Sequence, residues 1–300
     1  MATNDTTANT DMVSPARVTF LDGQNDLSML EVTTRCSFAE IYCHGAQVTQ
    51  FRKKDEPPLL FMSQFSRFAD GQPIRGGIPV IFPWFGLREG LGQHGFARIK
   101  DWEVKEIVPG ADGSVSLRFR LPECPEAATL PAFTADYIVT VGEGLSCKLI
   151  VTNDSREDPF TFENCLHTYF EVGDITAISI EGLNGVHYVD TVANFSMVQE
   201  SSDRIRIGAE TDRIYINTQH AVEILDSRYA RKIRIEKEGS LSTVVWNPWI
   251  AKAQQMQDFG NEEYLKMVCV ESGNVGTNKI TLAPGETSTL AIHLSSEAAS

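Results

Sequence analysis

Two arginines stand on separate, glycine-bounded stretches of the chain. Arg75 lies in "GQPIRGGIPVIFPWFG" and Arg98 lies in "LGQHGFARIKDW". Pro79 and Pro83 prevent the apolar run after Arg75 from forming a helix or a regular central strand. Two guanidinium groups on such loops can grip a phosphate, because each offers paired donors that match the phosphate oxygens. Alternatively, either arginine caps a carbonyl group or forms a structural ion pair with one of the nearby acids, Asp70, Glu89 and Asp101.

A histidine suited to proton transfer lies in "PFTFENCLHTYFEV", where apolar and polar residues alternate. One face of this pattern is apolar and consists of Phe160, Phe162, Leu166 and Phe170. The other face is mixed and carries His167, Glu163, Cys165 and Tyr169. We therefore expect His167 to point into a partly polar space, where imidazole suits acid or base chemistry near neutral pH. A lone histidine on a strand is more often a hydrogen-bonded structural residue, and this alternative stays open.

A carboxylate that could act as a base, Glu271, ends an apolar run in "LKMVCVESGNV". Its position directly before Ser-Gly-Asn predicts that Glu271 lies where a buried strand runs out into a loop. Partial desolvation there would raise the pKa of the carboxyl group and make the carboxylate a stronger base. The structural alternative is that Glu271 accepts backbone N–H groups from the following turn.

Several further residues could contact a ligand. Gln93 and His94 share the glycine-bounded stretch of the second arginine, where side chains can converge without obeying the alternation of a sheet. The stretch "TDRIYIN" offers Asp212, and "VVWNPW" offers Trp246 and Trp249. A tryptophan face can stack on a sugar ring, although tryptophans in β-sandwiches are mostly core residues. The remaining histidines are predicted to be structural: His44, His187, His220 and His293.

The elements that must position these residues read as strands. In "SVSLRFRL" one face carries Val115, Leu117, Phe119 and Leu121, and "LSCKLIV", "RKIRIEKEG" and "STLAIHLSS" repeat this period of two. Turn signals such as "PGADGS" and "VGEGL" separate these stretches. Only "PEAATLPAF" and "GNEEYLKM" predict short helical turns. The pattern predicts an all-β protein in which two sheets pack as a sandwich.

The organisation of the chain predicts one domain. No internal repeat, long linker or low-complexity block interrupts residues 15–295, and residues 1–14 are predicted to be a disordered tail. The polar, acidic start lacks the apolar segment of a signal peptide, and no apolar run approaches the roughly 18 residues of a membrane span. The six cysteines show no zinc spacing and are too scattered for a disulfide scaffold. We expect a cytoplasmic protein with reduced thiols, and a monomer.

The charge of the chain restricts its partners. The formal net charge is −14, and the pI is about 4.9. This strong negative balance argues against nucleic acid and anionic membrane surfaces as partners. Any anionic ligand must therefore be held by a local cluster of positive charge.

Six ordered stretches taken together carry a family resemblance. The chain resembles the hexose-6-phosphate 1-epimerases, the glucose-6-phosphate mutarotases of the aldose 1-epimerase superfamily, in RGGIPVIFPWFG, QHGFAR, ENCLHTYF, TDRIYIN, VVWNPW and VESGNV. The likeness covers most of the chain apart from its ends. It implies a galactose mutarotase-like supersandwich, a large antiparallel β-sandwich with few short helices, in agreement with the alternation above. It also implies interconversion of the α and β anomers of glucose 6-phosphate or a related hexose 6-phosphate, without metal or cofactor.

The resemblance assigns roles to individual positions. His167 matches the general acid of the family, and Glu271 matches its general base. Arg75 and Arg98 fall where the family holds the 6-phosphate. The sugar-contacting positions correspond to Gln93, His94, Asp212 and Trp246.

Three other functions stay open on the sequence alone. A mutarotase for unphosphorylated aldoses would keep His167 and Glu271 but hold no anion at the arginines. A sugar-phosphate-binding or regulatory protein that has lost catalysis is a second alternative, against which the presence of both proton-transfer candidates argues. A glycoside hydrolase would use Asp212 and Glu271 as paired carboxylates, which must lie about 5–10 Å apart.

Overall fold

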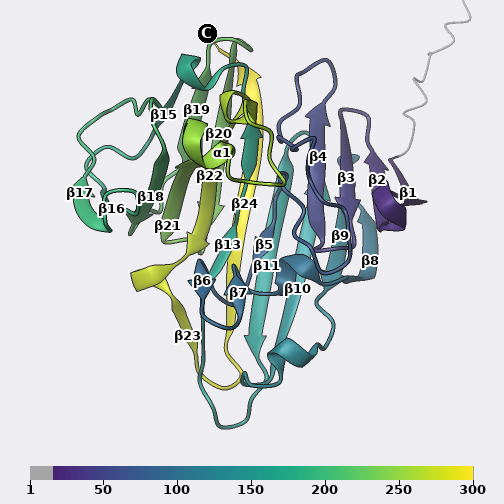
Figure 1. Cartoon of the computed structure of the whole chain (residues 1–300). Coiled ribbons are helices and arrows are strands. Elements are labelled where there is room, and N and C mark those ends of the chain that lie inside the picture. The colour runs from purple at the N-terminus through teal and green to yellow at the C-terminus, as the bar shows by residue number, and fades with distance from the viewer. Residues whose placement is uncertain (1–15, 300) are drawn as a thin grey trace, which may run out of the picture.

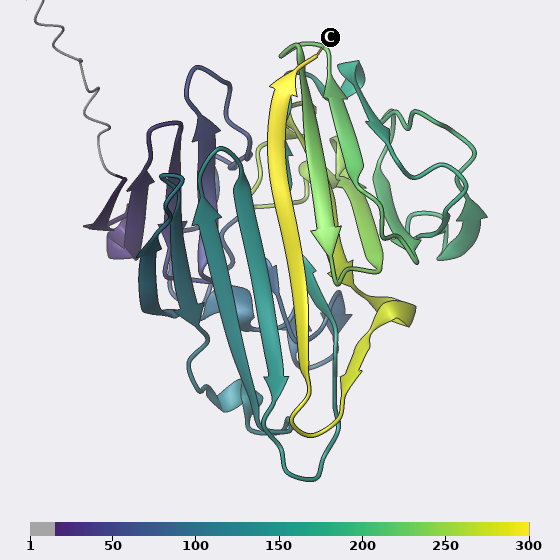
Figure 2. The ribbon, with the colours of Figure 1, turned by 180° about the vertical axis from the view of Figure 1, so that it is seen from behind.

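Two large antiparallel sheets that pack face to face make up most of the protein (Figures 1 and 2). The computed structural model describes residues 16–299. The predicted N-terminal tail, residues 1–14, lies outside the described residues. The architecture confirms the prediction of an all-β sandwich.

The back sheet lies behind in Figure 1 and faces the viewer in Figure 2. Its strands, in spatial order, are β15 (Ile178–Glu181), β19 (Val222–Asp226), β20 (Arg231–Glu238), β24 (Thr287–Ala298), β11 (Leu145–Asn153), β10 (Phe133–Val141), β9 (Val115–Arg120) and β8 (Glu103–Pro109). In β9, Val115, Leu117 and Phe119 are buried, whereas the residues between them are partly exposed. Alternation with a period of two therefore places one face of this sheet in the core, as predicted.

The site sheet is the layer that carries the candidate chemistry. Its strands, in spatial order, are β17 (Ser196–Gln199), β16 (His187–Asp190), β18 (Thr211–Ile216), β21 (Ser242–Asn247), β22 (Met267–Asn274), β13 (Asn164–Leu166) and β5 (Val80–Ile81). One further strand, β14 (Tyr169–Glu171), pairs with β22. Every residue of β21 and β22 is buried, because both strands lie in the middle of the sheet.

Smaller ladders complete the fold. A four-stranded sheet contains β1 (Arg17–Asp22), β2 (Ser28–Thr33), β3 (Ser37–Tyr42) and β4 (Gln47–Lys53). It is joined to the segment that leads into β5 by a bridge between Val48 and Ile78. Two-stranded ladders are formed by β6 (Leu87–Arg88) with β7 (Gly92–Gln93), and by β12 (Phe160–Phe162) with β23 (Ile280–Leu282).

Helices in the described residues are short. The two predicted helical turns are present as the 3-10 helices η3 (Pro125–Ala127) and η5 (Glu263–Lys266). The other short helices are α1 (Trp249–Ala253), η1 (Gln24–Asp26), η2 (Ala97–Ile99), η4 (Ile175–Ala177) and η6 (Gly276–Asn278). The five residues of α1 are too few for a helical pattern to be visible in the sequence. At its start, the side chain of Asn247 accepts the N–H of Trp249 at 2.9 Å.

The structure bears on two expectations from the sequence, the absence of a membrane span and the state of the cysteines. Within residues 16–299, no helix has both the length and the apolar character needed to cross a membrane. All six cysteines lie in the described part of the chain and have free thiols.

The predicted strand end at Glu271 is wrong. Strand β22 continues through Asn274, because Ser272, Gly273 and Asn274 pair with Leu166, Cys165 and Asn164 of β13. Ser-Gly-Asn resembles a turn signal in the sequence, but a neighbouring strand satisfies its backbone groups. Glu271 therefore lies inside a central strand and is more deeply buried than expected.

Candidate active site

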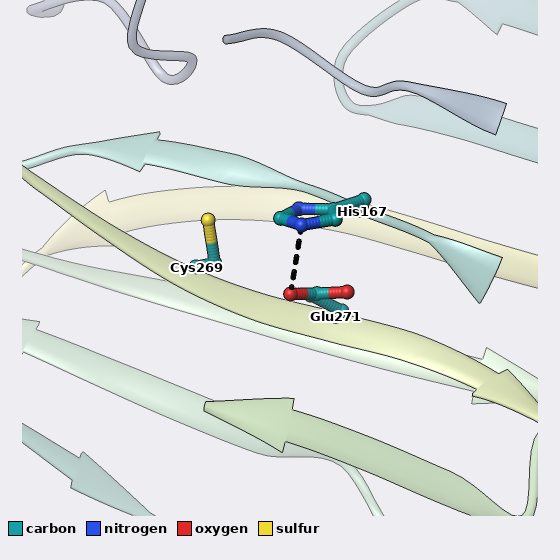
Figure 3. A group of neighbouring side chains, drawn as sticks. All are labelled: His167, Cys269 and Glu271. Carbon is teal, nitrogen blue, oxygen red and sulfur yellow. Dashed lines mark ion pairs between the residues drawn. The ribbon is translucent and has the colours of Figure 1, made fainter. Parts of the chain in front are cut away.

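His167 and Glu271 face each other across neighbouring strands of the site sheet. Strand β13 pairs Leu166 with Ser272 of β22, and β14 continues along β22 in the same register. Extending this register across the gap between β13 and β14 sets His167 directly opposite Glu271. Nε2 of His167 lies 3.3 Å from Oε1 of Glu271 (Figure 3). The two residues that the sequence singled out for proton transfer therefore form a pair.

His167 occupies the mixed face of its strand, as the alternation predicted. The residues of the opposite face belong to the main core: Phe160, Phe162, Leu166 and Phe170. The imidazole ring stacks on the ring of Tyr169, with centroids 4.8 Å apart and planes 9° from parallel. It meets the ring of His94 edge-on at 5.7 Å. These contacts hold the imidazole in one orientation beside Glu271.

A cavity of about 790 Å³ opens at this pair. Seven of the eight predicted site residues line it: Arg75, Gln93, His94, His167, Asp212, Trp246 and Glu271. Strand register explains how the more distant members join them. Trp246 of β21 lies opposite Cys269 of β22, and Asp212 of β18 lies opposite Trp246. The eighth predicted residue, Arg98, is not among the residues that line the cavity.

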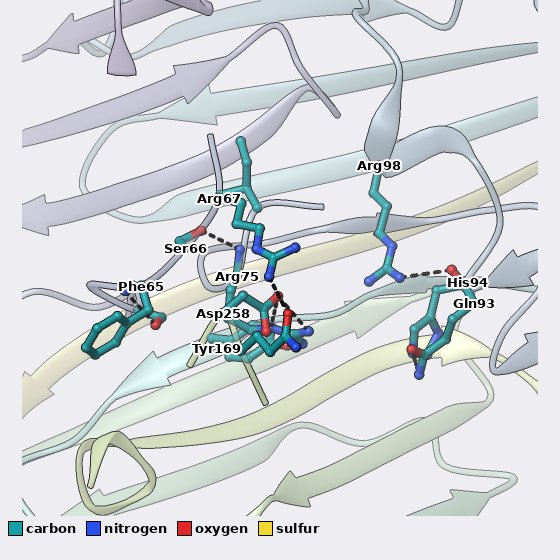
Figure 4. A network of polar contacts seen from close by, with 12 residues as sticks. Phe65, Ser66, Arg67, Arg75, Gln93, His94, Arg98, Tyr169 and Asp258 are labelled. Atoms are coloured by element: carbon teal, nitrogen blue, oxygen red, sulfur yellow. Dashed lines mark hydrogen bonds and ion pairs between the residues drawn. The ribbon is translucent and has the colours of Figure 1, made fainter. Parts of the chain in front are cut away.

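Arg75 already has partners. Its Nε and Nη2 groups donate to Oδ2 of Asp258 at 3.2 and 3.1 Å, and Nη1 donates to the hydroxyl of Tyr169 at 2.9 Å (Figure 4). Burial acts to lower the pKa of Arg75, but the contacts with Tyr169 and Asp258 more than offset it and raise the pKa. Arg75 therefore forms the structural ion pair that the sequence left open as an alternative to phosphate binding. Its partner is Asp258, which is more distant in the sequence than the nearby acids considered above.

Arg98 is the less satisfied of the two arginines. It is buried on η2, and Nη2 donates to the carbonyl oxygen of Gln93 at 2.9 Å (Figure 4). Its Nε has no hydrogen-bond partner within residues 16–299, and no carboxylate of that range forms an ion pair with it. Burial and then the charge of Arg75 lower the pKa of Arg98 to about 10, so the group stays cationic near neutral pH.

His94 is held as a neutral donor at the cavity wall. Its Nδ1 accepts the backbone N–H of Gly86 at 3.2 Å, so the proton of the neutral ring lies on Nε2. Nε2 lies 3.1 Å from the amide nitrogen position of Gln93, so in this tautomer the amide must present its oxygen to the ring N–H. Burial, followed by the charges of Arg98 and Arg75, lowers the pKa of His94 to about 3. The ring therefore stays neutral near neutral pH, with both of its nitrogen atoms in contact with neighbouring residues.

Burial moves the two pKa values of the central pair in opposite directions. Only 1% of Glu271 and 7% of His167 is exposed. Desolvation raises the pKa of the Glu271 carboxyl group well above its ordinary value. Desolvation, with the nearby charges of Arg98 and Arg75, lowers the pKa of His167 well below its ordinary value. The pair is therefore stabilised with one proton between its two members, so it can both accept and give a proton.

A metal ion fits this site poorly. Ligand atoms of His167, Cys269 and Glu271 lie within 4.8 Å of one another (Figure 3), which is close enough for a metal site. A thiol binds metal as thiolate, however, and burial raises the pKa of Cys269 well above its ordinary value. The positive charges of Arg75 and Arg98 also act on this region. We assign no metal to the cluster.

Three residues of the site were missed by the sequence reasoning. Asp258 and Tyr169 hold Arg75, as described above. Glu163 lines the cavity and joins two parts of its wall, because Oε2 accepts the N–H of Phe85 at 3.1 Å and Oε1 accepts the N–H of Gly276 at 2.7 Å. The alternation signal was available for Glu163 and Tyr169, since both share the mixed face with His167. No sequence signal pointed to Asp258.

Comparison with known proteins places this site in a family context. Residues 29–295 match the family model described as aldose 1-epimerase. A protein of Cenchrus ciliaris, provisionally named glucose-6-phosphate 1-epimerase, is 36% identical over 259 residues, which cover 83% of this chain and 78% of that protein. A protein of the same provisional name from Escherichia coli strain K12 is 34% identical over 251 residues, which cover 82% of each chain.

A solved structure shares the architecture. The crystal structure of a provisionally identified mutarotase from Salmonella typhimurium superimposes with a TM-score of 0.86 at 27% sequence identity. The match covers 94% of each chain. The two structures agree over nearly their full length, so this chain and the Salmonella protein share the arrangement of the sheets as well as sequence similarity.

Proposed function

Since this chain belongs to the aldose 1-epimerase family and is an epimerase that interconverts sugar anomers, we propose that its substrate is a hexose 6-phosphate, with D-glucose 6-phosphate the first candidate. The family membership rests on a match over residues 29–295. The phosphorylated substrate is suggested by the provisional names of the relatives. The catalytic assignment rests on one observation, the 3.3 Å contact between His167 and Glu271 inside the cavity.

Anomer exchange requires two proton transfers at the C1–O5 unit of the sugar. The two pKa shifts place the single proton of the pair on Glu271 in the free enzyme, so in the proposed mechanism this proton first passes to Nε2 of His167 across the 3.3 Å contact. The Glu271 carboxylate then takes the proton of the C1 hydroxyl while His167 gives its proton to the ring oxygen. The C1–O5 bond then breaks, C1 becomes an aldehyde, and rotation about C1–C2 presents its other face. On closure, O5 returns its proton to His167 and Glu271 returns its proton to O1. The one-proton pair therefore ends the cycle unchanged.

Unsatisfied nitrogen atoms near the pair support an anionic, polar substrate. Nδ1 of His167 and Nε of Arg98 are buried without hydrogen-bond partners among the described residues. Buried polar atoms are seldom left unpaired, and a buried cation without a carboxylate is especially unfavourable. A phosphate group near Arg75 would also be stabilised by the charge of Arg98. This guanidinium group lies directly behind the cavity wall, where it donates to the carbonyl oxygen of the lining residue Gln93.

A remote phosphate can also help to place the reacting end of the sugar. Arg75 holds the hydroxyl of Tyr169, and the ring of Tyr169 stacks on His167. An anion bound at Arg75 is therefore fixed relative to the imidazole through two contacts. Binding energy from a non-reacting group can in this way orient the C1–O5 unit against the acid and the base.

One observation favours an enzyme for unphosphorylated aldoses instead. Asp258 already neutralises Arg75, so a phosphate dianion would have to approach a guanidinium group that has a carboxylate beside it. A neutral sugar would avoid that repulsion. The unpaired charge of Arg98 is the reason that we place the hexose 6-phosphate first.

Calorimetry on the wild-type enzyme separates these two substrates. Anomer exchange leaves an equilibrated sugar unchanged, so glucose 6-phosphate and glucose can be titrated directly without net turnover. We expect glucose 6-phosphate to bind at least about tenfold more tightly, since charge-assisted hydrogen bonds contribute more than neutral ones. Inorganic phosphate should compete with it. Equal affinity for the two sugars, without competition by phosphate, would support the neutral-sugar alternative.

The location and the oligomeric state stay predictions from the sequence. We propose that the protein works in the cytoplasm as a monomer, and sedimentation of the purified protein would test the second point.

A further inference from the structure

The carboxyl group of Glu271 has a second neighbour besides His167. The thiol of Cys165 lies on the adjacent strand β13, with Sγ 3.4 Å from Oε2 of Glu271. Within residues 16–299, no other hydrogen bond reaches the Glu271 side chain, and Oε1 faces His167. The two carboxyl oxygens therefore have different partners on the two sides of the group.

Strand register builds this contact. Cys165 pairs with Gly273, which lies two residues beyond Glu271 on the same face of β22. A Cβ atom added at Gly273 would lie 2.8 Å from the Cβ of Cys165 and 2.5 Å from the carbonyl oxygen of Asn164. The glycine thus leaves the space in which the thiol reaches diagonally to the carboxyl group.

We propose that Cys165 is a positioning residue for the catalytic base, whose thiol fixes Oε2 of Glu271 and leaves Oε1 as the oxygen that exchanges protons. This inference rests on the proposed role of Glu271. A carboxylate held at Oε2 by the thiol cannot rotate, so Oε1 stays directed at Nε2 of His167, on the side where protons are exchanged. A thiol is a weak donor, and its hydrogen bond lowers the pKa of the carboxyl group against the larger effect of burial.

The charged and titratable groups around the contact come from several elements and are retained in the variants below. They are His167, Cys269, Asp212, Arg98, Arg75 and Lys237. Lys237 belongs to β20, and its charge acts on the thiol of Cys165. A change in pH dependence on replacing Cys165 can therefore be assigned to the lost thiol. The matched control is Cys147→Ala, which removes a thiol of equal burial from β11 of the back sheet.

The test compares the pH profile of kcat/KM for anomer exchange in wild type, Cys165→Ala, Cys165→Ser and Cys147→Ala. Loss of the donor in Cys165→Ala should move the alkaline limb, at which the one-proton pair loses its proton from Glu271, upward by about half to one pH unit and lower kcat severalfold. The hydroxyl of Cys165→Ser should restore the limb to the wild-type position or below it. Cys147→Ala should leave both the limb and kcat as in wild type.

Stability provides a readout that does not depend on activity. A raised native pKa of Glu271 means that stability is lost as pH rises through that value. Cys165→Ala should therefore lose more stability, relative to wild type, at high pH than at low pH. A lowered kcat with an unmoved alkaline limb, together with a stability loss that does not depend on pH, would overturn the proposal and leave Cys165 a packing residue. If wild type exchanged no sugar, the function would fail, while the stability comparison would still decide the thiol contact.

Discussion

Replacement of Glu271 by glutamine is expected to reduce kcat for anomer exchange by roughly 10²–10⁴-fold, the usual contribution of a positioned acid or base. Glutamine keeps the shape of the side chain but cannot take up the proton of the C1 hydroxyl. The contact with Nε2 of His167 and the contact with Cys165 can both be kept by the amide. The loss should therefore appear in kcat, with only a small change in KM. Exchange rates followed by NMR on the purified variant provide the measurement.

A buried carboxylate outside the cavity serves as the control. Glu200 is buried and accepts hydrogen bonds from Tyr215 and from two backbone N–H groups, and it does not line the cavity. Glu200→Gln should therefore retain the wild-type kcat, whatever it costs in stability. A folded Glu271→Gln variant that exchanged anomers within twofold of wild type would remove Glu271 from the mechanism.

The same variant tests the desolvation of the base. The native pKa of Glu271 is raised by burial, so its carboxyl group binds more protons in the folded than in the unfolded protein above pH 4.5. The contribution of Glu271 to the free energy of unfolding is fully present below the pKa that its carboxyl group has in the unfolded chain. This contribution is lost as pH rises through the higher pKa of the group in the folded protein. Glu271→Gln should thus gain stability relative to wild type as pH increases, which urea unfolding at several pH values can measure. A constant difference would mean that the native carboxyl group titrates normally.

Replacement of Arg75 by methionine is expected to discriminate between phosphorylated and neutral sugars. Loss of the guanidinium group should reduce kcat/KM for glucose 6-phosphate by roughly 10–100-fold, because hydrogen bonds to charged groups contribute about 1.5–3 kcal/mol. The loss for glucose should be several times smaller and should reflect only the freed hydroxyl of Tyr169. Methionine keeps much of the apolar stem of arginine, so the cavity wall is retained.

The design must account for the carboxylate that Arg75 neutralises. In Arg75→Met, Asp258 is left without its partner near the cavity and would itself repel an anion. The double variant Arg75→Met/Asp258→Asn removes this repulsion. If the guanidinium group binds the phosphate, the double variant should still favour glucose 6-phosphate far less than wild type does. Recovery of the full preference would assign the loss to the stranded carboxylate, and equal losses on both sugars in the two variants would contradict the phosphate site.

Local sequence patterns predicted the faces of the strands well. The period of two that placed His167 opposite the four core residues of its stretch depends only on the chemistry of neighbouring residues. The same reasoning failed at Glu271, because Ser-Gly-Asn resembles a turn when read alone. Pairing of that segment with β13 is set more than 100 residues away and leaves no local trace.

Contacts between distant segments were beyond local patterns. The partner of Arg75 is 183 residues away in the sequence, and the thiol that holds Glu271 is 106 residues away. For this reason the two arginines look alike in the sequence, although Arg75 forms an ion pair with Asp258 and Arg98 forms none with a carboxylate among residues 16–299. The family resemblance supplied the grouping of His167 with Glu271, and strand register explains it physically.

The measurement that tests the central claim most directly is anomer exchange of glucose 6-phosphate by NMR magnetisation transfer, beside an equal concentration of glucose. The rates are recorded with and without the wild-type enzyme, under conditions in which both sugars exchange slowly by themselves. The account predicts strong acceleration for glucose 6-phosphate and little for glucose. Equal acceleration of both would leave the acid–base pair in place but contradict the anion site. Absence of acceleration for either sugar would contradict the assignment of His167 and Glu271 as the catalytic pair.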